Sequence, residues 1–182
     1  MPSYLRPKMG GGTFFFTVVT FERRKIFTSD ANRQILAKAI TEVQKQHPFF
    51  IEAWVLLPEH LHIIWTLPEG DTDYSKRWGL IKARFSKETK TLLHKEQSVS
   101  PSRNKCRETT IWQRRFWEHT IRDDKDFHKH IDYIHYNPVK HGLVREVKDW
   151  PLSSFHRFVR QGFYPSNWGE GILFSPEYSF GE

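Results

Sequence analysis

The sequence predicts an α+β fold, with an antiparallel-rich sheet of four to five strands, helices on one face, and the other face open for a site. Two observations indicate this class. Runs rich in β-branched and aromatic residues alternate with stretches of helical periodicity, and a proline-containing reversal joins two adjacent strand-like runs. At 182 residues the chain suits one domain, which is long enough to bury a core without disulfides.

The elements are expected in the order strand, helix, strand, strand, helix, strand, helix. Thr28, Ser29 and Asp30 offer N-caps for the first helix, which should extend to about Gln46. Pro138 should stop the last helix, because proline lacks an N–H and disfavours helical conformation in the residue before it. The expected segments are a flexible arm at 1–12, strands at 13–21, 49–57, 60–67 and 111–121, helices at 28–46, 74–94 and 122–138, a mobile loop at 97–110, and an irregular tail at 145–182.

Composition limits the class of protein. A single cysteine, Cys106, excludes an internal disulfide or a multi-cysteine zinc site and fits a reducing cytoplasm. Residues 1–8 lack the apolar core of a signal peptide, and no apolar run approaches the roughly 20 residues that span a bilayer, so a soluble cytoplasmic protein with no membrane partner is expected.

The charge balance suggests the kind of partner. Lys and Arg total 28 against 21 Asp and Glu, which gives a net charge of +7, and 15% of the residues are aromatic. This combination favours nucleic acid, although aromatic residues also fill protein cores. Candidate phosphate-binding residues, which could equally form an ordinary solvated surface, are Arg23, Arg24, Lys25, Lys82, Arg84 and Lys87.

The strand at 60–67 carries the clearest chemical signal. Side chains alternate across a strand, so His60 and His62 should share one face while Leu61, Ile63 and Trp65 pack into the core. The two histidine Cβ atoms should lie roughly 6–7 Å apart, which lets both imidazoles reach one ion or phosphate. A plain polar patch on a half-buried strand would give the same pattern.

A second polar stripe is expected on the last helix. Asp126, His130, Tyr133 and Asn137 recur at helical spacing beside an apolar stripe that should dock the helix. Tyr136 falls nearly opposite the apolar stripe and should be the more exposed of the two tyrosines.

With these motifs the sequence resembles the HUH single-tyrosine transposases, and specifically the REP-associated tyrosine transposases of bacteria, where REP denotes repetitive extragenic palindromes. The resemblance covers about residues 14–158. It rests on the opening strand at 14–20, Leu57-Pro-Glu-His-Leu-His-Ile-Ile64, Ile111-Trp-Gln113, Phe116-Trp-Glu-His119, Tyr133-Ile-His-Tyr-Asn-Pro-Val-Lys-His-Gly-Leu-Val144 and Trp150-Pro-Leu-Ser-Ser154.

The resemblance implies a ferredoxin-like or RRM-like sheet and a transposase domain at 13–144, followed by a tail at 145–182 that packs on the domain or extends it. It further implies an enzyme that cleaves and rejoins single-stranded DNA near hairpins through a 5′-phosphotyrosine, with Mg²⁺ or Mn²⁺ as cofactor, acting as a monomer near the bacterial nucleoid. Tyr133 becomes the nucleophile, and His60, His62 and Asn137 become metal ligands. His130 and Asp126 are alternatives to Asn137 as the third ligand.

Two other functions fit parts of the same pattern. A catalytically silent module on this fold would bind hairpin DNA or RNA without cleaving it. A histidine-based phosphoesterase or nucleotidyl transferase would ordinarily carry a second histidine motif or a third histidine on the strand, where Ile64 and Thr66 stand instead.

Overall fold

The computed structural model describes residues 11–93, 101–102 and 109–171. Four strands form one antiparallel sheet in the order β2-β3-β1-β4: β1 (Thr13–Val19), β2 (Phe50–Leu56), β3 (His60–Thr66) and β4 (Trp117–Thr120). The helices are α1 (Asp30–Gln46), α2 (Tyr74–Leu93), α4 (Asp124–Lys140) and α5 (Phe155–Arg160), with short 3-10 turns at Phe21–Arg23, Ile26–Thr28 and Val147–Asp149. The predicted α+β class and antiparallel sheet are confirmed, and four strands are present in the described residues.

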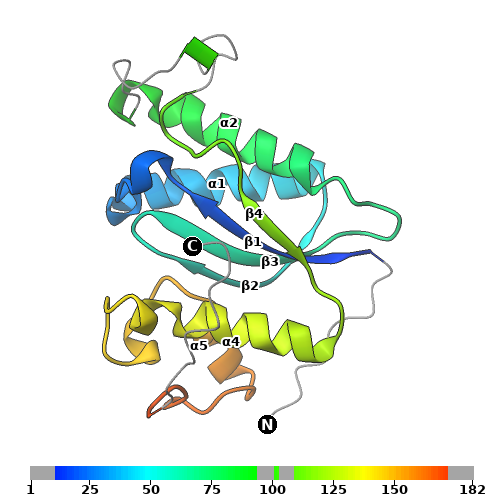
Figure 1. Cartoon of the computed structure of the whole chain (residues 1–182), viewed down its shortest axis with the longest axis vertical. Coiled ribbons are helices and arrows are strands. Elements are labelled where there is room, and N and C mark those ends of the chain that lie inside the picture. The colour runs from blue at the N-terminus through cyan, green and yellow to red at the C-terminus, as the bar shows by residue number, and fades with distance from the viewer. Residues whose placement is uncertain (1–10, 94–100, 103–108, 172–182) are drawn as a thin grey trace.

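The sheet buries two different faces. Phe14, Phe16 and Val18 of β1 point into a core shared with α1 and α2, together with alternate residues of β3. Phe15 points the other way, into a second core beneath α4 that includes Phe127 and Ile131. Figure 1 shows α1 and α2 on one side of the sheet and α4 with α5 on the other.

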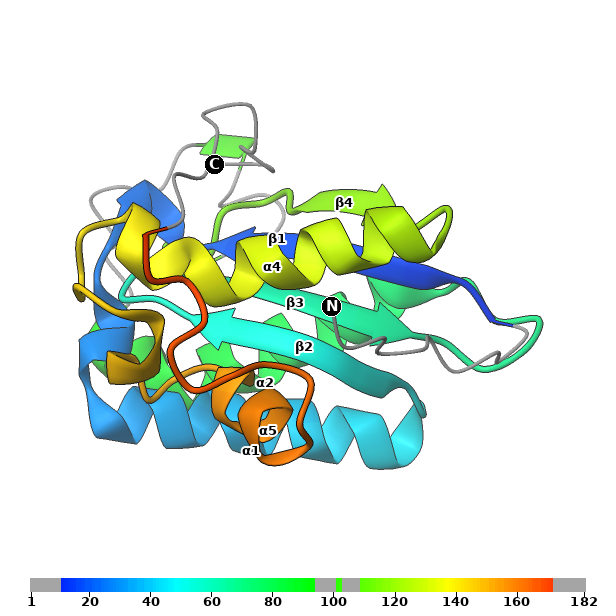
Figure 2. The ribbon, with the colours of Figure 1, turned by 90° about the horizontal axis from the view of Figure 1, so that it is seen from below.

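The expectation that the second face would be open was therefore wrong. Helix α4 lies across it, as Figure 2 shows, and packs against β2 and β3. Its apolar stripe requires burial, and the face that α1 and α2 leave uncovered offers an apolar surface in Phe15, Val55 and Ile64. The site thus lies between a helix and the sheet.

Helix ends follow local chemistry, with one exception. The side chain of Ser29 accepts a hydrogen bond from the Asn32 N–H and caps α1, and the Asp123 side chain accepts one from the Asp126 N–H and caps α4. Pro138 does not stop α4, which continues to Lys140. The backbone N–H groups of His141, Gly142 and Leu143 donate to carbonyls of residues 137–139 and close the helix after the proline.

Other boundaries moved as well. The fourth strand is only Trp117–Thr120 instead of 111–121; Trp112 makes an isolated bridge with Thr20, and Ile111 is buried in the core. The stretch after α4 is more ordered than expected, because residues 152–154 bond to the β2 edge and α5 follows directly. The predicted arm at 1–12 and loop at 97–110 fall mostly outside the described residues.

Candidate active site

His60 and His62 lie where the strand pattern predicted, on the same face of β3. Both are fully buried, and their Nε2 atoms are 3.1 Å apart. Two imidazole nitrogens bound at about 2.1 Å to one ion at right angles would lie about 3 Å apart. The observed separation therefore suits a shared cation.

Each histidine is held by its other nitrogen. His60 Nδ1 lies 3.1 Å from Glu59 Oε1, and His62 Nδ1 lies 2.8 Å from Thr17 Oγ1. The hydrogen bond from His60 lowers the pKa of Glu59, although burial opposes the shift. The ionised carboxylate accepts a hydrogen bond from the Nδ1–H of His60, and in this tautomer the Nε2 atom of His60 carries a lone pair on the side of His62. Outer partners of this kind orient ligating histidines and fix their tautomers.

Tyr133 reaches this pair from α4. Its ring centroid is 5.3 Å from that of His62, and its side chain is only 1% exposed. Lys140 donates to the Tyr133 hydroxyl at 3.3 Å and lies 4.8 Å from the centre of the ring. Tyr136 is more exposed than Tyr133, as the helical spacing predicted.

Asn137 lies between two residues that touch the histidine pair. It is fully buried, one turn after Tyr133 and one turn before His141, whose ring is 5.3 Å from that of His60. Residues four apart share a helix face, so Asn137 lies on the same stripe. This placement keeps Asn137 as the third candidate ligand.

Asp126 and His130, the alternative ligands, belong to a different cluster with His119 of β4. Asp126 lies 2.7 Å from His119 Nε2, and His130 Nδ1 donates to the Asp126 backbone carbonyl at 2.8 Å. Phe15 separates this cluster from the His60–His62 pair, because its ring contacts His130 at 4.9 Å and His62 at 5.5 Å.

The three side chains of that cluster are close enough to hold a metal ion, but the rings are not oriented for one. The His119 and His130 rings stack at 4.6 Å with 16° between their planes. An imidazole binds a metal in the plane of its ring, and two stacked rings cannot both point their lone pairs at one ion. Burial lowers the pKa of His130 to about 4, despite the nearby Asp126. Burial also pushes the pKa of Asp126 up, but hydrogen bonds from His119 and the Arg122 N–H outweigh it, so that this pKa lies below its ordinary value.

The six candidate phosphate-binding residues divide into two groups. Lys82 donates to the Gln113 carbonyl, Arg84 pairs with Glu42, and Arg24 donates to the carbonyls of Leu93 and Thr110, so all three have structural partners. Arg23, Lys25 and Lys87 are exposed. Arg23 lies close enough to lower the pKa of Glu59 through its charge, whereas α2, which carries Lys87, covers the opposite face of the sheet.

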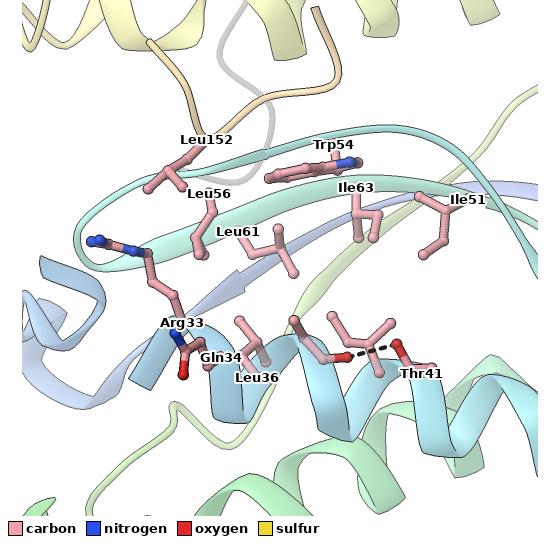
Figure 3. Close-up of a pocket in the computed structure, with 12 residues that line it drawn as sticks. Arg33, Gln34, Leu36, Thr41, Ile51, Trp54, Leu56, Leu61, Ile63 and Leu152 are labelled. Atoms are coloured by element: carbon pink, nitrogen blue, oxygen red, sulfur yellow. Dashed lines mark hydrogen bonds between the residues drawn. The ribbon is translucent and has the colours of Figure 1, made fainter. Parts of the chain in front are cut away.

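A pocket of about 410 Å³ opens between α1 and the β2–β3 hairpin (Figure 3). Leu36 of α1 faces Leu56, Leu61 and Ile63 of the hairpin across it, and Arg33 is the only charged residue in its lining. It lies on the opposite side of the sheet from the histidine pair and has no polar cluster suited to phosphate chemistry.

Four residues of the site were missed from the sequence. Glu59 and Thr17 required the strand register, in which Thr17 pairs with His62. Lys140 and His141 lie in the motif at 133–144, but a helix expected to end at Pro138 gave no reason to place them at the site. Lys140 and His141 follow Asn137 by three and four residues, about one helical turn, and this spacing was the available signal.

This arrangement matches a known class of proteins. The family model described as "Transposase IS200 like" matches residues 12–137, a stretch that includes both histidines, Tyr133 and Asn137. The chain belongs to this family of transposases, which are enzymes.

Full-length relatives specify the branch. The chain is 46% identical over 182 residues to the REP-associated tyrosine transposase of Escherichia coli K12, covering 100% of this chain and 98% of the relative. A Haemophilus influenzae protein named for the same group is 45% identical over 170 residues, covering 93% and 94%. A solved REP-associated tyrosine transposase bound to a REP hairpin superimposes with a TM-score of 0.76 at 45% identity, over 100% of this chain and 98% of that one. The chain is thus a member of the REP-associated branch, as its motifs predicted. No helix in the described residues is long and apolar enough to cross a membrane.

Proposed function

We propose that this chain cleaves and rejoins single-stranded DNA beside REP-type hairpins, with Tyr133 as the nucleophile. The observation that carries the proposal is the meeting of the Tyr133 ring with His62 at 5.3 Å, at a pair of buried imidazoles whose Nε2 atoms are 3.1 Å apart. The relative bound to a REP hairpin supports the choice of DNA.

His60, His62 and Asn137 would hold a divalent cation, for which two imidazoles and an amide oxygen are a suitable donor set. The ion, Mg²⁺ or Mn²⁺, would supply positive charge to the non-bridging oxygens of the scissile phosphate. Glu59 and Thr17 would keep both imidazoles oriented with Nε2 toward the ion, and the ionised Glu59 would add negative charge behind His60.

Lys140 has a part in the same reaction. Its ammonium group lies 3.3 Å from the Tyr133 oxygen and favours the ionised form of the tyrosine after the hydroxyl proton passes to water. The tyrosinate oxygen then bonds to phosphorus while the bond from phosphorus to the 3′ oxygen breaks, and the 3′ oxygen takes a proton from water. Reversal by another 3′ hydroxyl rejoins a strand without ATP.

A direct test is to incubate the chain with a labelled single-stranded hairpin and Mn²⁺, and to look for a covalent adduct on a denaturing gel. An adduct that forms with Tyr136→Phe but not with Tyr133→Phe supports the proposal. Hairpin binding without any adduct would favour the silent binding module, and hydrolysis of small nucleotide substrates without an adduct would favour a phosphoesterase.

A further inference from the structure

A row of three side chains leads from the histidine pair to the edge of the sheet. In the strand register His62 pairs with Thr17, and Thr17 pairs with Trp117 of β4, so all three point to the α4 face. Neighbouring strands lie about 4.8 Å apart, so Trp117 is about 10 Å from His62 along this row. His62 and Thr17 are buried, whereas Trp117 is 37% exposed.

The indole ring is held in a defined orientation. The Phe15 ring meets it edge-on, with centroids 5.7 Å apart and 74° between the planes. His119, two residues along β4, lies parallel to it within 6° at 6.0 Å. Phe15 also contacts Tyr133 at 6.1 Å, so one ring connects Trp117 to the nucleophile. A partly exposed aromatic ring with fixed orientation is suited to stacking, because little conformational freedom remains to be lost.

Two exposed cations flank β4, while the carboxylate of Asp126 on the α4 face is paired with His119. Arg115 precedes the strand and Arg122 follows it, and both are exposed. Glu118, the acidic residue within the strand, pairs in register with Phe16 and so faces the α2 side. Single-stranded nucleic acid is commonly bound by aromatic rings that stack on bases, next to cations that follow the backbone.

We propose that Trp117 is a stacking platform for an unpaired base of the DNA strand whose phosphate lies at Tyr133, with Arg115 and Arg122 binding the backbone on either side. The inference rests on the proposed function, and it specifies single-stranded DNA next to the cleaved phosphate as the ligand. The hairpin stem would be bound elsewhere. Stacking is sequence-tolerant because every base has a π-face, so this subsite would contribute affinity and position more than base identity.

The test measures binding alone, in the Tyr133→Phe background so that no strand is cut. Affinity is measured by fluorescence anisotropy for a REP-type hairpin with a single-stranded flank and for the same hairpin without the flank. Trp117→Ala should weaken binding of the flanked hairpin by between about 5-fold and 150-fold, the range for one stacked base, and should leave the blunt hairpin unchanged. Trp117→Phe should retain most of the affinity. Phe50→Ala is the matched control, since Phe50 is 49% exposed on β2, the strand at the opposite edge.

Abasic nucleotides placed singly along the flank make the test specific. At one position, the abasic nucleotide should weaken binding by the protein that retains Trp117 as much as Trp117→Ala does. The same abasic nucleotide should not weaken binding by the Trp117→Ala protein any further, because that contact has already been lost. Additive losses at every position, or an equal loss for blunt and flanked hairpins, would overturn the role of Trp117 and leave the proposed function standing. If the Tyr133→Phe protein binds neither DNA, the proposed function itself fails.

Discussion

Acid is expected to destabilise this fold because two buried histidines of α4 stay neutral in it. Burial lowers the pKa of His130 to about 4, and burial together with the charges of Arg157 and His156 lowers the pKa of His135 to about 3, against an ordinary value of 6.5. Below about pH 6.5 the unfolded chain therefore binds two protons, at His130 and His135, that the folded chain does not bind. The free energy of unfolding should fall as the pH drops through 6.5, and should keep falling to about 4 for His130 and about 3 for His135.

The size of the effect follows from these values. Each proton contributes a slope of about 1.4 kcal/mol per pH unit once the unfolded histidine is protonated. Between pH 7.5 and 5.5 each histidine should remove about 1.4 kcal/mol, or roughly 2.8 kcal/mol for the pair, a large part of a typical domain stability of about 5–15 kcal/mol. The comparison stops at pH 5.5 because burial raises the pKa of Asp132, which acts in the opposite direction at lower pH.

Urea denaturation at pH 7.5, 6.5 and 5.5 measures this slope. His130→Gln and His135→Gln should each reduce the pH dependence by one proton, whatever each costs in stability at pH 7.5, and the double variant should lose both protons. His128→Gln, at a partly exposed position on the same helix, is the control. An unchanged slope in either buried-histidine variant would show that the residue is not held neutral by the fold.

Three predictions concern the reaction. Tyr133→Phe should abolish cleavage and adduct formation while leaving hairpin binding intact, and Tyr136→Phe should stay active; the reverse pattern on a denaturing gel would mean that the wrong tyrosine was chosen. His62→Ala should lower the cleavage rate by more than about 100-fold and weaken Mn²⁺ binding. In the unsubstituted chain, Mn²⁺ should bind more tightly when DNA is present. Full cleavage activity in EDTA, or a Mn²⁺ affinity that His62→Ala leaves unchanged, would remove the metal from the mechanism. Lys140→Gln should slow cleavage by about 10- to 100-fold near neutral pH, and the deficit should shrink as the pH rises, since alkali ionises the tyrosine without help. Lys129→Gln, an exposed lysine on the same helix, should have no effect, and a deficit in Lys140→Gln that does not change with pH would assign Lys140 a structural role.

The local elements were predictable because each depends on nearby residues. The alternation around His60 and His62 predicted which face of β3 each side chain would take, and the spacing of Tyr133 and Tyr136 predicted which tyrosine would be buried. Ser29 and Asp123 act as caps through their own side chains. These features require no knowledge of the tertiary fold.

The predictions that were wrong or incomplete concern contacts between segments that are distant in the sequence. Periodicity shows that α4 has an apolar stripe, but it does not show which face of the sheet the stripe covers. The rule that proline ends a helix underestimated how well a last turn can close after Pro138, and so Lys140 and His141 were left outside the site. Thr17 lies 45 residues from His62 in sequence, and only the strand register brings the two together.

The outer surface of α4 also defines how much chain is needed to fold. The Nε2 atom of His135 is hydrogen-bonded to the Ser154 hydroxyl oxygen at 2.9 Å, and the Tyr164 hydroxyl donates a hydrogen bond to the Asp132 carboxylate. The aromatic rings that enclose His135 are those of Phe155, Phe158, Tyr164 and Trp168. A chain cut at residue 144 would expose this buried surface and free the β2 edge that residues 152–154 cover. The family match at 12–137 ends before this covering segment begins, whereas the smallest autonomous folding unit should reach at least to Trp168.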